Sequence, residues 1–241
     1  MSSKQIAFNK AFLDVVRSLT PIQPSMKFSR EGDVVTVLMA STSKSIAFKI
    51  DAPATFFDFE GTDINFRDFS EFHQFINAFE SISLTQAENS MVISNQNSEI
   101  NYVLTNPAAM PKIPTSIARK DPNVTFILSV KDLTEISKMS NLVKAEYIEI
   151  KFNKTSNQIA LKLFNSAHDN SFKKTYTPEK IAENTDTFDF IIRSEVISRM
   201  PDVSDYRISL VNSGFIFLEW QKDDMKFFAV SGRIRKTEKA E

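Results

Sequence analysis

The residues that could do chemistry are few in this sequence and stand far apart. Cysteine is absent, and the two histidines, His73 and His168, are too few for most zinc sites. None of the four glycines lies within six residues of another, so no glycine-rich loop brings backbone amides against a phosphate. No G-x-S-x-G, H-E-x-x-H or kinase-type signature occurs. The sequence therefore predicts a protein that is not an enzyme and that holds no metal or cofactor.

The chemistry that remains is electrostatic. The 241 residues include 29 Lys and Arg against 30 Asp and Glu, so no overall basic field attracts nucleic acid. Any contact with DNA must come from the local placement of cations. The apolar runs are far too short to span a bilayer, and the N-terminal residues lack the apolar core of a signal peptide. We expect an intracellular, cytoplasmic protein, in the host-cell cytoplasm if it is viral.

A repeat of 64 residues must position these cations. The apolar pattern of residues 64–72 returns at residues 128–136 and 192–200. The matching positions are 64, 128 and 192; 69, 133 and 197; and 72, 136 and 200. Subtracting 64 once more places Phe8 and Phe12 at the positions of Phe72 and Ile76, as a degenerate first copy. Self-similarity at a fixed spacing indicates one supersecondary unit that is used four times.

The repeated unit is predicted to be β-α-β-β-β. Each copy begins with a short β-rich run, such as residues 63–66, and then turns helical. A helix of about 12 residues is predicted in the second copy by its apolar stripe of Phe69, Phe72, Ile76 and Phe79. After each helix the apolar period changes to two, which predicts strand pairs such as residues 144–152 and 158–164. The fold class is therefore α+β.

A proline-rich segment separates the second copy from the third. Pro107, Pro111 and Pro114 stop both helix and sheet ladder, and Pro122 closes the segment. The sequence predicts two similar domains, 1–106 and 123–241, joined by an extended connector over 107–122. The alternative is an ordinary proline-rich surface loop within one domain.

Four such units in two domains resemble the replicative DNA sliding clamp, the processivity factor of DNA polymerases. The resemblance covers about residues 4–235, and the stretch 66–79 followed by 81–85 is most similar to the bacteriophage clamp. It implies a DNA-clamp fold and a homotrimeric ring around double-stranded DNA of any sequence, with helices lining the bore and edge strands paired between subunits. The implied partners are a DNA polymerase, tethered to its template by the ring, and a separate clamp loader. Contact with transcription proteins is a further possibility of the family.

The charge of the helical segments has the sign that this resemblance requires. Basic residues exceed acidic ones by two over the four segments together, although the second segment is acidic, which puts its DNA contact in doubt. Lys10 and Lys138 are the best candidates, because each lies seven residues from another cation on the same side of its helix. The full set of candidate DNA-facing residues is Lys4, Lys10, Arg17, Lys131, Lys138 and Arg199. The alternative for each is an ordinary solvated side chain.

The resemblance also implies a pocket for a partner peptide beside the connector and the C-terminal strands. The candidate residues are Met110, Ile113, Ile117, Phe227, Phe228 and Val230. Alternating strand positions face opposite sides, so at least one of Phe227 and Phe228 must point into the core.

Two other functions fit the same pattern. One is a monomeric DNA-binding processivity subunit of the same fold, and the other is a duplicated β-rich virion structural protein. A catalytic or small-ligand domain would need convergent polar groups, for which the sequence offers no candidate.

Overall fold

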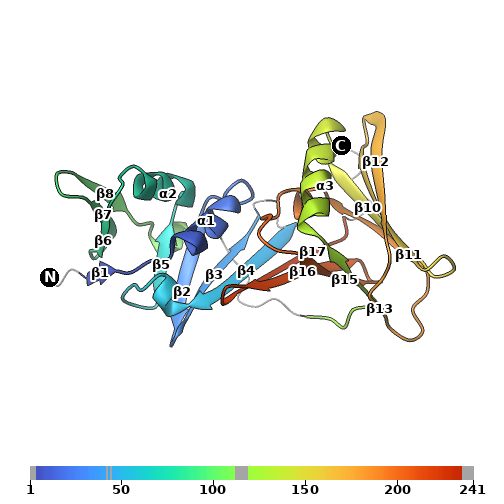
Figure 1. The fold of residues 1–241 in the computed structure, drawn as a ribbon, viewed down its shortest axis with the longest axis horizontal. Coiled ribbons are helices and arrows are strands. Elements are labelled where there is room, and N and C mark those ends of the chain that lie inside the picture. Colours follow the sequence, from blue (N-terminus) through green and yellow to red (C-terminus); the bar gives the residue numbers. More distant parts are fainter. Residues whose placement is uncertain (1–3, 42, 44, 112–118, 235–241) are drawn as a thin grey trace. The chain divides into compact units, whose positions relative to one another are not determined.

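The four repeats are present in the computed structural model, which describes residues 4–41, 43, 45–111 and 119–234. The chain divides into two compact units, which are described separately. The first comprises Met1–Thr42, Phe48–Pro114 and Gln221–Phe227, and the second comprises Ser43–Ala47, Thr115–Trp220 and Phe228–Glu241. Each unit holds two successive β-α-β-β-β copies (Figure 1). The domain boundaries expected from the prolines remain a prediction.

The first unit contains copies one and two. Copy one consists of β1 (Lys4–Ile6), α1 (Lys10–Ser18), β2 (Met26–Glu31), β3 (Val34–Ala40) and β4 (Ile46–Pro53). Copy two consists of β5 (Asp63–Phe66), α2 (Phe69–Asn77), β6 (Ser83–Gln86), β7 (Ser90–Ser94) and β8 (Glu99–Val103). The 3-10 turns η1 (Ala54–Phe56) and η2 (Pro107–Ala109) follow them. One four-stranded sheet has the order β1-β6-β7-β8, and the strand order β4-β3-β2-β5 forms the other layer.

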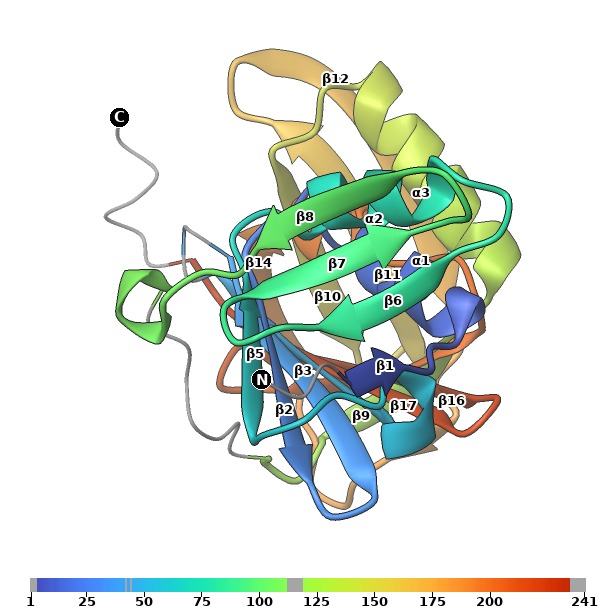
Figure 2. The ribbon, with the colours of Figure 1, turned by 90° about the vertical axis from the view of Figure 1, so that its left-hand side faces the viewer.

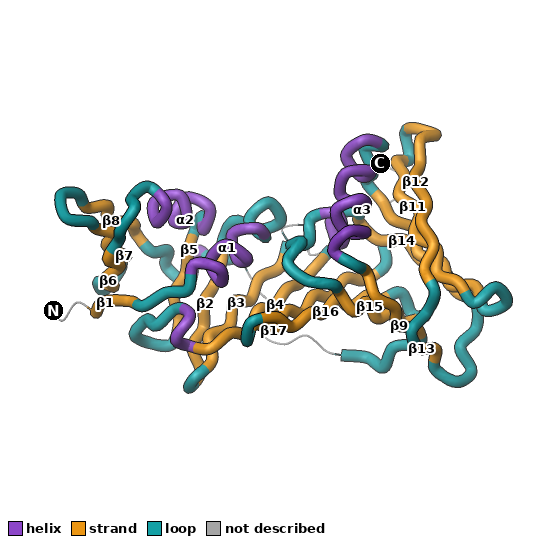
Figure 3. The backbone as a smooth tube through the Cα atoms, in the orientation of Figure 1, coloured by secondary structure: helices purple, strands orange, loops and turns teal. Residues whose placement is uncertain are grey.

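The second unit contains copies three and four. Copy three consists of β9 (Val124–Leu128), α3 (Val130–Leu142), β10 (Tyr147–Asn153), β11 (Gln158–Asn165) and β12 (His168–Tyr176), with a short β13 (Lys180–Ile181) after it. Copy four consists of β14 (Phe188–Arg193), α4 (Glu195–Ser198), β15 (Tyr206–Val211), β16 (Phe215–Lys222) and β17 (Met225–Gly232). The strand orders are β12-β11-β10-β14 and β13-β9-β15-β16-β17. The backbone trace shows the same alternation of helix and strands (Figure 3).

The repeat positions deduced from the sequence are core positions. All nine side chains at the three matching sets are buried, namely Ile64, Leu128, Ile192, Phe69, Leu133, Ile197, Phe72, Ile136 and Met200. In the first unit α2 packs behind the β1-β6-β7-β8 sheet (Figure 2), and the Tyr102 ring of β8 lies 5.3 Å from that of Phe72. Phe28 joins this core to β2, with its ring 5.1 Å from Phe66. The β-α-β-β-β prediction is therefore confirmed.

Two local expectations differ from the structure. Helix α2 has nine residues and ends at Asn77, so Phe79 lies beyond it. The Asn77 side chain donates a hydrogen bond to the His73 carbonyl oxygen (2.9 Å), the kind of local bond that competes with further helical turns. Phe8 precedes α1 and forms an isolated bridge with Phe57 instead of entering the helix.

Candidate nucleic-acid interface and partner pocket

Helix α1 presents two of the predicted cations to solvent. The Asn9 side chain caps the helix by accepting a hydrogen bond from the Phe12 amide (3.0 Å). Phe12 and its apolar neighbours then turn one face into the core. Lys10 and Arg17 are exposed and lie seven residues apart, on the same side of the helix.

The one acidic residue of α1 is already paired. Asp14 lies between the two cations in sequence, but its Oδ1 is 2.7 Å from Nε2 of His73 on α2. The neighbouring helices of the first unit are joined in this way. His73 therefore acts as a hydrogen-bonding partner between helices, and α1 exposes two cations against this one carboxylate.

Helix α3 repeats this arrangement in the second unit. Lys131 and Lys138 are exposed, whereas both acidic residues of the helix contact Lys174 on β12. Lys174 Nζ lies 2.6 Å from Asp132 Oδ1 and also donates to Glu135 Oε2. Partial burial lowers the pKa of Lys174, but the hydrogen bonds to these carboxylates outweigh burial and raise it. In the described part of the chain, Lys131 and Lys138 have no such ion pair.

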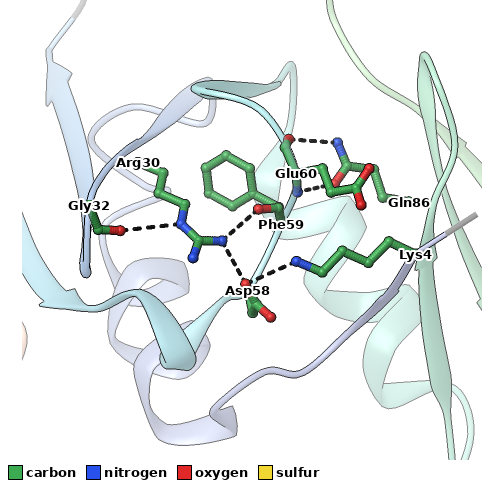
Figure 4. Close-up of polar contacts among 7 residues, drawn as sticks. All are labelled: Lys4, Arg30, Gly32, Asp58, Phe59, Glu60 and Gln86. Atoms are coloured by element: carbon green, nitrogen blue, oxygen red, sulfur yellow. Dashed lines mark hydrogen bonds and ion pairs between the residues drawn. The ribbon is translucent and has the colours of Figure 1, made fainter.

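The other two predicted cations are placed differently. Arg199 is exposed at the C-cap of the short helix α4. Lys4 lies on a strand, β1, and its Nζ is 3.1 Å from Asp58 Oδ1, which also accepts a hydrogen bond from Arg30 Nη1 (2.6 Å; Figure 4). The Lys4–Asp58 ion pair thus links β1 to the loop before β5. Lys4 therefore lies on a strand and not on a helix, and its charge is paired with a carboxylate 54 residues away in the sequence, so its contact with DNA stays a prediction.

Asp58→Asn is expected to loosen β1. Hydrogen bonds from Lys4 and Arg30 hold the pKa of Asp58 below its usual value. The contact therefore stabilises the fold above the unfolded pKa of about 3.9, and this contribution is lost as the pH falls through the lower folded pKa. The variant should lose less than about 1 kcal/mol at pH 7, because the pair is partly exposed. Faster amide exchange in β1 would be the readout.

The control for this prediction is Asp186→Asn, which removes a carboxylate paired with Lys154 on the exposed surface of the second unit. It should leave exchange in β1 unchanged. Equal β1 exchange rates in Asp58→Asn and the unaltered protein would show that the Lys4 contact does not hold the strand.

A pocket of about 630 Å³ opens on the second unit, where the last residues of the predicted connector meet the C-terminal strands. Phe217 and Phe228 line it and belong to a small apolar cluster with Val211, Phe215 and Val230. Most of the rest of its lining is charged, namely Arg119, Lys120, Asp121, Glu179, Lys180, Arg207 and Glu219, with Pro122, Thr125 and Ser209 between them. The site combines an aromatic base with a charged border, which suits an apolar anchor flanked by polar groups.

The equivalent sheet of the first unit lacks this aromatic base. There the cross-strand row runs Gln5, Thr85, Val92 and Asn101, with Gln5 and Asn101 exposed and the other two half-buried. On the second unit the corresponding neighbours are Ser209 and Phe217, followed by Val211 and Phe215. Of these two equivalent sheets, only the one in the second unit therefore carries the aromatic base.

The predicted pocket residues separate into four groups. Phe228 lines the pocket, and Val230 packs against its apolar cluster. Phe227 is only 2 % exposed, with its ring 6.1 Å from that of Phe48, so it belongs to the core. Met110, half-buried after η2, is not among the lining residues. Ile113 and Ile117 lie outside the described residues.

Sequence reasoning missed the charged half of the site. Arg119 Cζ lies 4.5 Å from the centroid of the Phe228 ring, and Lys120 Nζ lies 4.4 Å from that of Phe215. The only signal was the run of Arg119, Lys120 and Asp121 at the end of the connector. That run has no apolar periodicity, and nothing in its spacing points to the distant rings.

The described residues, 4–41, 43, 45–111 and 119–234, contain neither a metal site nor a membrane-spanning helix. No three His, Asp or Glu side chains there converge as a metal site. No helix in the same ranges is long and apolar enough to span a membrane.

This chain is similar to known proteins in its structure but matches none of them at the level of sequence. No family model matches the sequence, and no curated protein matches it either. Among solved structures, the proliferating cellular nuclear antigen of Entamoeba histolytica is similar over 97 % of this chain and 100 % of its own, with a TM-score of 0.74 and 13 % identity. The chain has the DNA-clamp fold.

Two further clamps share this fold. The A. fulgidus PCNA, solved with the C-terminal region of FEN-1 bound, covers 98 % of this chain and 99 % of its own, with a TM-score of 0.71 and 10 % identity. The H. pylori beta clamp covers 98 % of this chain and 67 % of its own, with a TM-score of 0.69 and 13 % identity. These neighbours are cellular sliding clamps, so the expected likeness to the bacteriophage version finds no support in them.

Proposed function

We propose that this protein is a DNA polymerase sliding clamp, a homotrimeric ring that encircles duplex DNA and tethers the polymerase. The observation that carries the proposal is a clamp fold over nearly the whole chain in which α1 and α3 expose cations whose acidic neighbours are already paired. Loose contacts of this kind suit sliding, because a few exposed cations attract phosphates without holding one register. No catalytic step is part of this role, which belongs inside the cell.

We propose that the ring closes through the edge strands β8 and β12. Each lies at the end of a four-stranded sheet, and β12 is nine residues long and largely exposed. Val103 on β8 is 68 % exposed, and a hollow of about 430 Å³ lies beside it, lined by Phe75 of α2 and Ile100 of β8. Long free edges invite pairing with another chain, and closure into a ring satisfies them without forming fibres.

We propose that partners, the polymerase and the clamp loader among them, dock a short peptide in the pocket of the second unit. Its aromatic base is the observation that favours this, together with its place beside the predicted connector over 107–122. The loader must be a separate ATP-driven protein, since the chain has no glycine-rich nucleotide loop.

Solution mass and DNA retention test the proposal. Light scattering should give about three times 27.4 kDa, and the protein, once loaded, should stay on nicked circular DNA but slide off linear DNA. A mass of one chain with DNA binding would favour the monomeric processivity subunit. Large assemblies that neither remain on circles nor stimulate a polymerase would favour the virion structural protein.

A further inference from the structure

The aromatic base of the partner pocket is covered by cations of the same chain. Arg119 and Lys120 lie over the Phe228 and Phe215 rings, at 4.5 and 4.4 Å from the ring centroids. Arg119 Nη2 is also 2.7 Å from Glu219 Oε1. A peptide that inserts an apolar side chain against these rings must therefore displace or realign two cations.

The charges around the pocket are not balanced. Arg119 pairs with Glu219, and Arg207 Nε lies 3.7 Å from Glu179 Oε2. Among the described lining residues, Lys120 and Lys180 have no carboxylate within ion-pair distance. Asp121 is the one lining carboxylate outside the two pairs, so the border has one cation in excess.

We propose that this pocket selects apolar peptides that also carry carboxylates. This inference rests on the proposed docking function and names the chemical class of the partner segment. A neutral peptide would displace Lys120 from its ring and offer the ammonium no new partner besides water. An acidic peptide replaces that contact with an ion pair and places a second carboxylate near Lys180.

The two ion pairs at the border of the pocket increase its preference for acidic peptides over basic ones. Glu219 and Glu179 are held by Arg119 and Arg207, so those two cations are less available to a ligand than Lys120 and Lys180. A basic peptide would meet Lys120 and Lys180, which have no carboxylate partner among the described residues, and be repelled. Lys120 and Lys180 are therefore the specificity-determining residues, while Phe217 and Phe228 supply affinity for any apolar anchor.

Three synthetic ten-residue peptides test the inference on the full-length protein. Each carries the same two phenylalanines and one leucine, flanked by three aspartates, three asparagines or three lysines, and binding is followed by fluorescence anisotropy. The aspartate peptide should bind roughly tenfold more tightly than the asparagine peptide at about 0.1 M salt, and the lysine peptide most weakly. The difference between the first two should shrink as salt is raised, because the contacts are exposed to solvent.

Three variants test which residues cause the preference for the aspartate peptide. Lys120→Gln combined with Lys180→Gln should bring the aspartate peptide close to the affinity of the asparagine peptide. Lys151→Gln combined with Lys162→Gln, an equal loss of two charges on β10 and β11 outside the pocket, should leave the preference intact. Phe228→Ala, checked for folding by thermal melting, should weaken the aspartate and asparagine peptides alike.

The outcomes distinguish this inference from the function on which it rests. Equal binding of all three peptides, lost in Phe228→Ala, would keep the docking pocket and overturn its charge selectivity. Failure of every peptide to bind would overturn both the charge selectivity and the docking pocket. Ring formation and retention on DNA are tested separately, by solution mass and by retention on circular DNA.

Discussion

Val103→Lys is expected to convert the ring to single chains. Val103 is 68 % exposed on the edge strand β8, and in the proposed ring a second copy covers it. A lysine there would have to lose its hydration without a defined carboxylate partner, and charged residues on edge strands are a known means of preventing sheet pairing. The mass should fall from about three times 27.4 kDa to one, and retention on circular DNA should fall to background.

The matched control is Val34→Lys. Val34 is also an exposed valine of the first unit, at 43 %, but it lies on β3, which has β4 and β2 as neighbours in its sheet. This variant should keep the trimer mass. If Val103→Lys stays trimeric at micromolar concentration, β8 is not at the subunit interface and the closure scheme must be replaced.

Reversing Lys10 and Lys138 to glutamate should impair retention on DNA while leaving the oligomer intact. Both side chains are exposed on helices whose acidic residues pair elsewhere, so each substitution turns a local positive charge into a negative one. Phosphate contacts dominate sequence-independent affinity, so retention on circular DNA at about 0.1 M salt should fall by roughly tenfold or more. Folding should persist, since neither side chain enters the core.

A double reversal on exposed strands separates position from net charge. Lys151→Glu with Lys162→Glu changes the total charge equally on β10 and β11, which are inner strands of their sheet and belong to neither candidate helix. Its retention should exceed that of the helix variant at every salt concentration. Unchanged retention of Lys10→Glu with Lys138→Glu at moderate salt would remove both residues from the interface.

The core of the fold could be predicted because its signal is periodic. Burial of Phe69, Leu133 and Ile197 follows from their apolar spacing, since a helix or strand must turn one face away from water whatever else surrounds it. Strands β12 and β13 have no comparable periodic signal in the sequence. Their side chains are mostly exposed, so no alternation of apolar and polar residues marks them.

The candidate site could be predicted only in part. Strand alternation required that Phe227 and Phe228 face opposite sides, but it did not decide which one enters the core. Helical spacing placed Lys10 and Lys138 on solvent-facing sides, but it also admitted Lys4, whose carboxylate partner is 54 residues away. Spacing describes a residue's neighbours on its own element and is silent about neighbours from elsewhere.

The amino-acid sequence by itself determined a fourfold β-α-β-β-β duplication, because apolar periodicity is a local property that each copy repeats. Only the tertiary structure decided which charges remain exposed and unpaired, because pairing depends on residues that meet across long separations. Lys174 neutralises Asp132 from 42 residues away, and Arg119 reaches the Phe228 ring from the end of the predicted connector. The same contacts determine which exposed cations are left to bind DNA or a partner peptide.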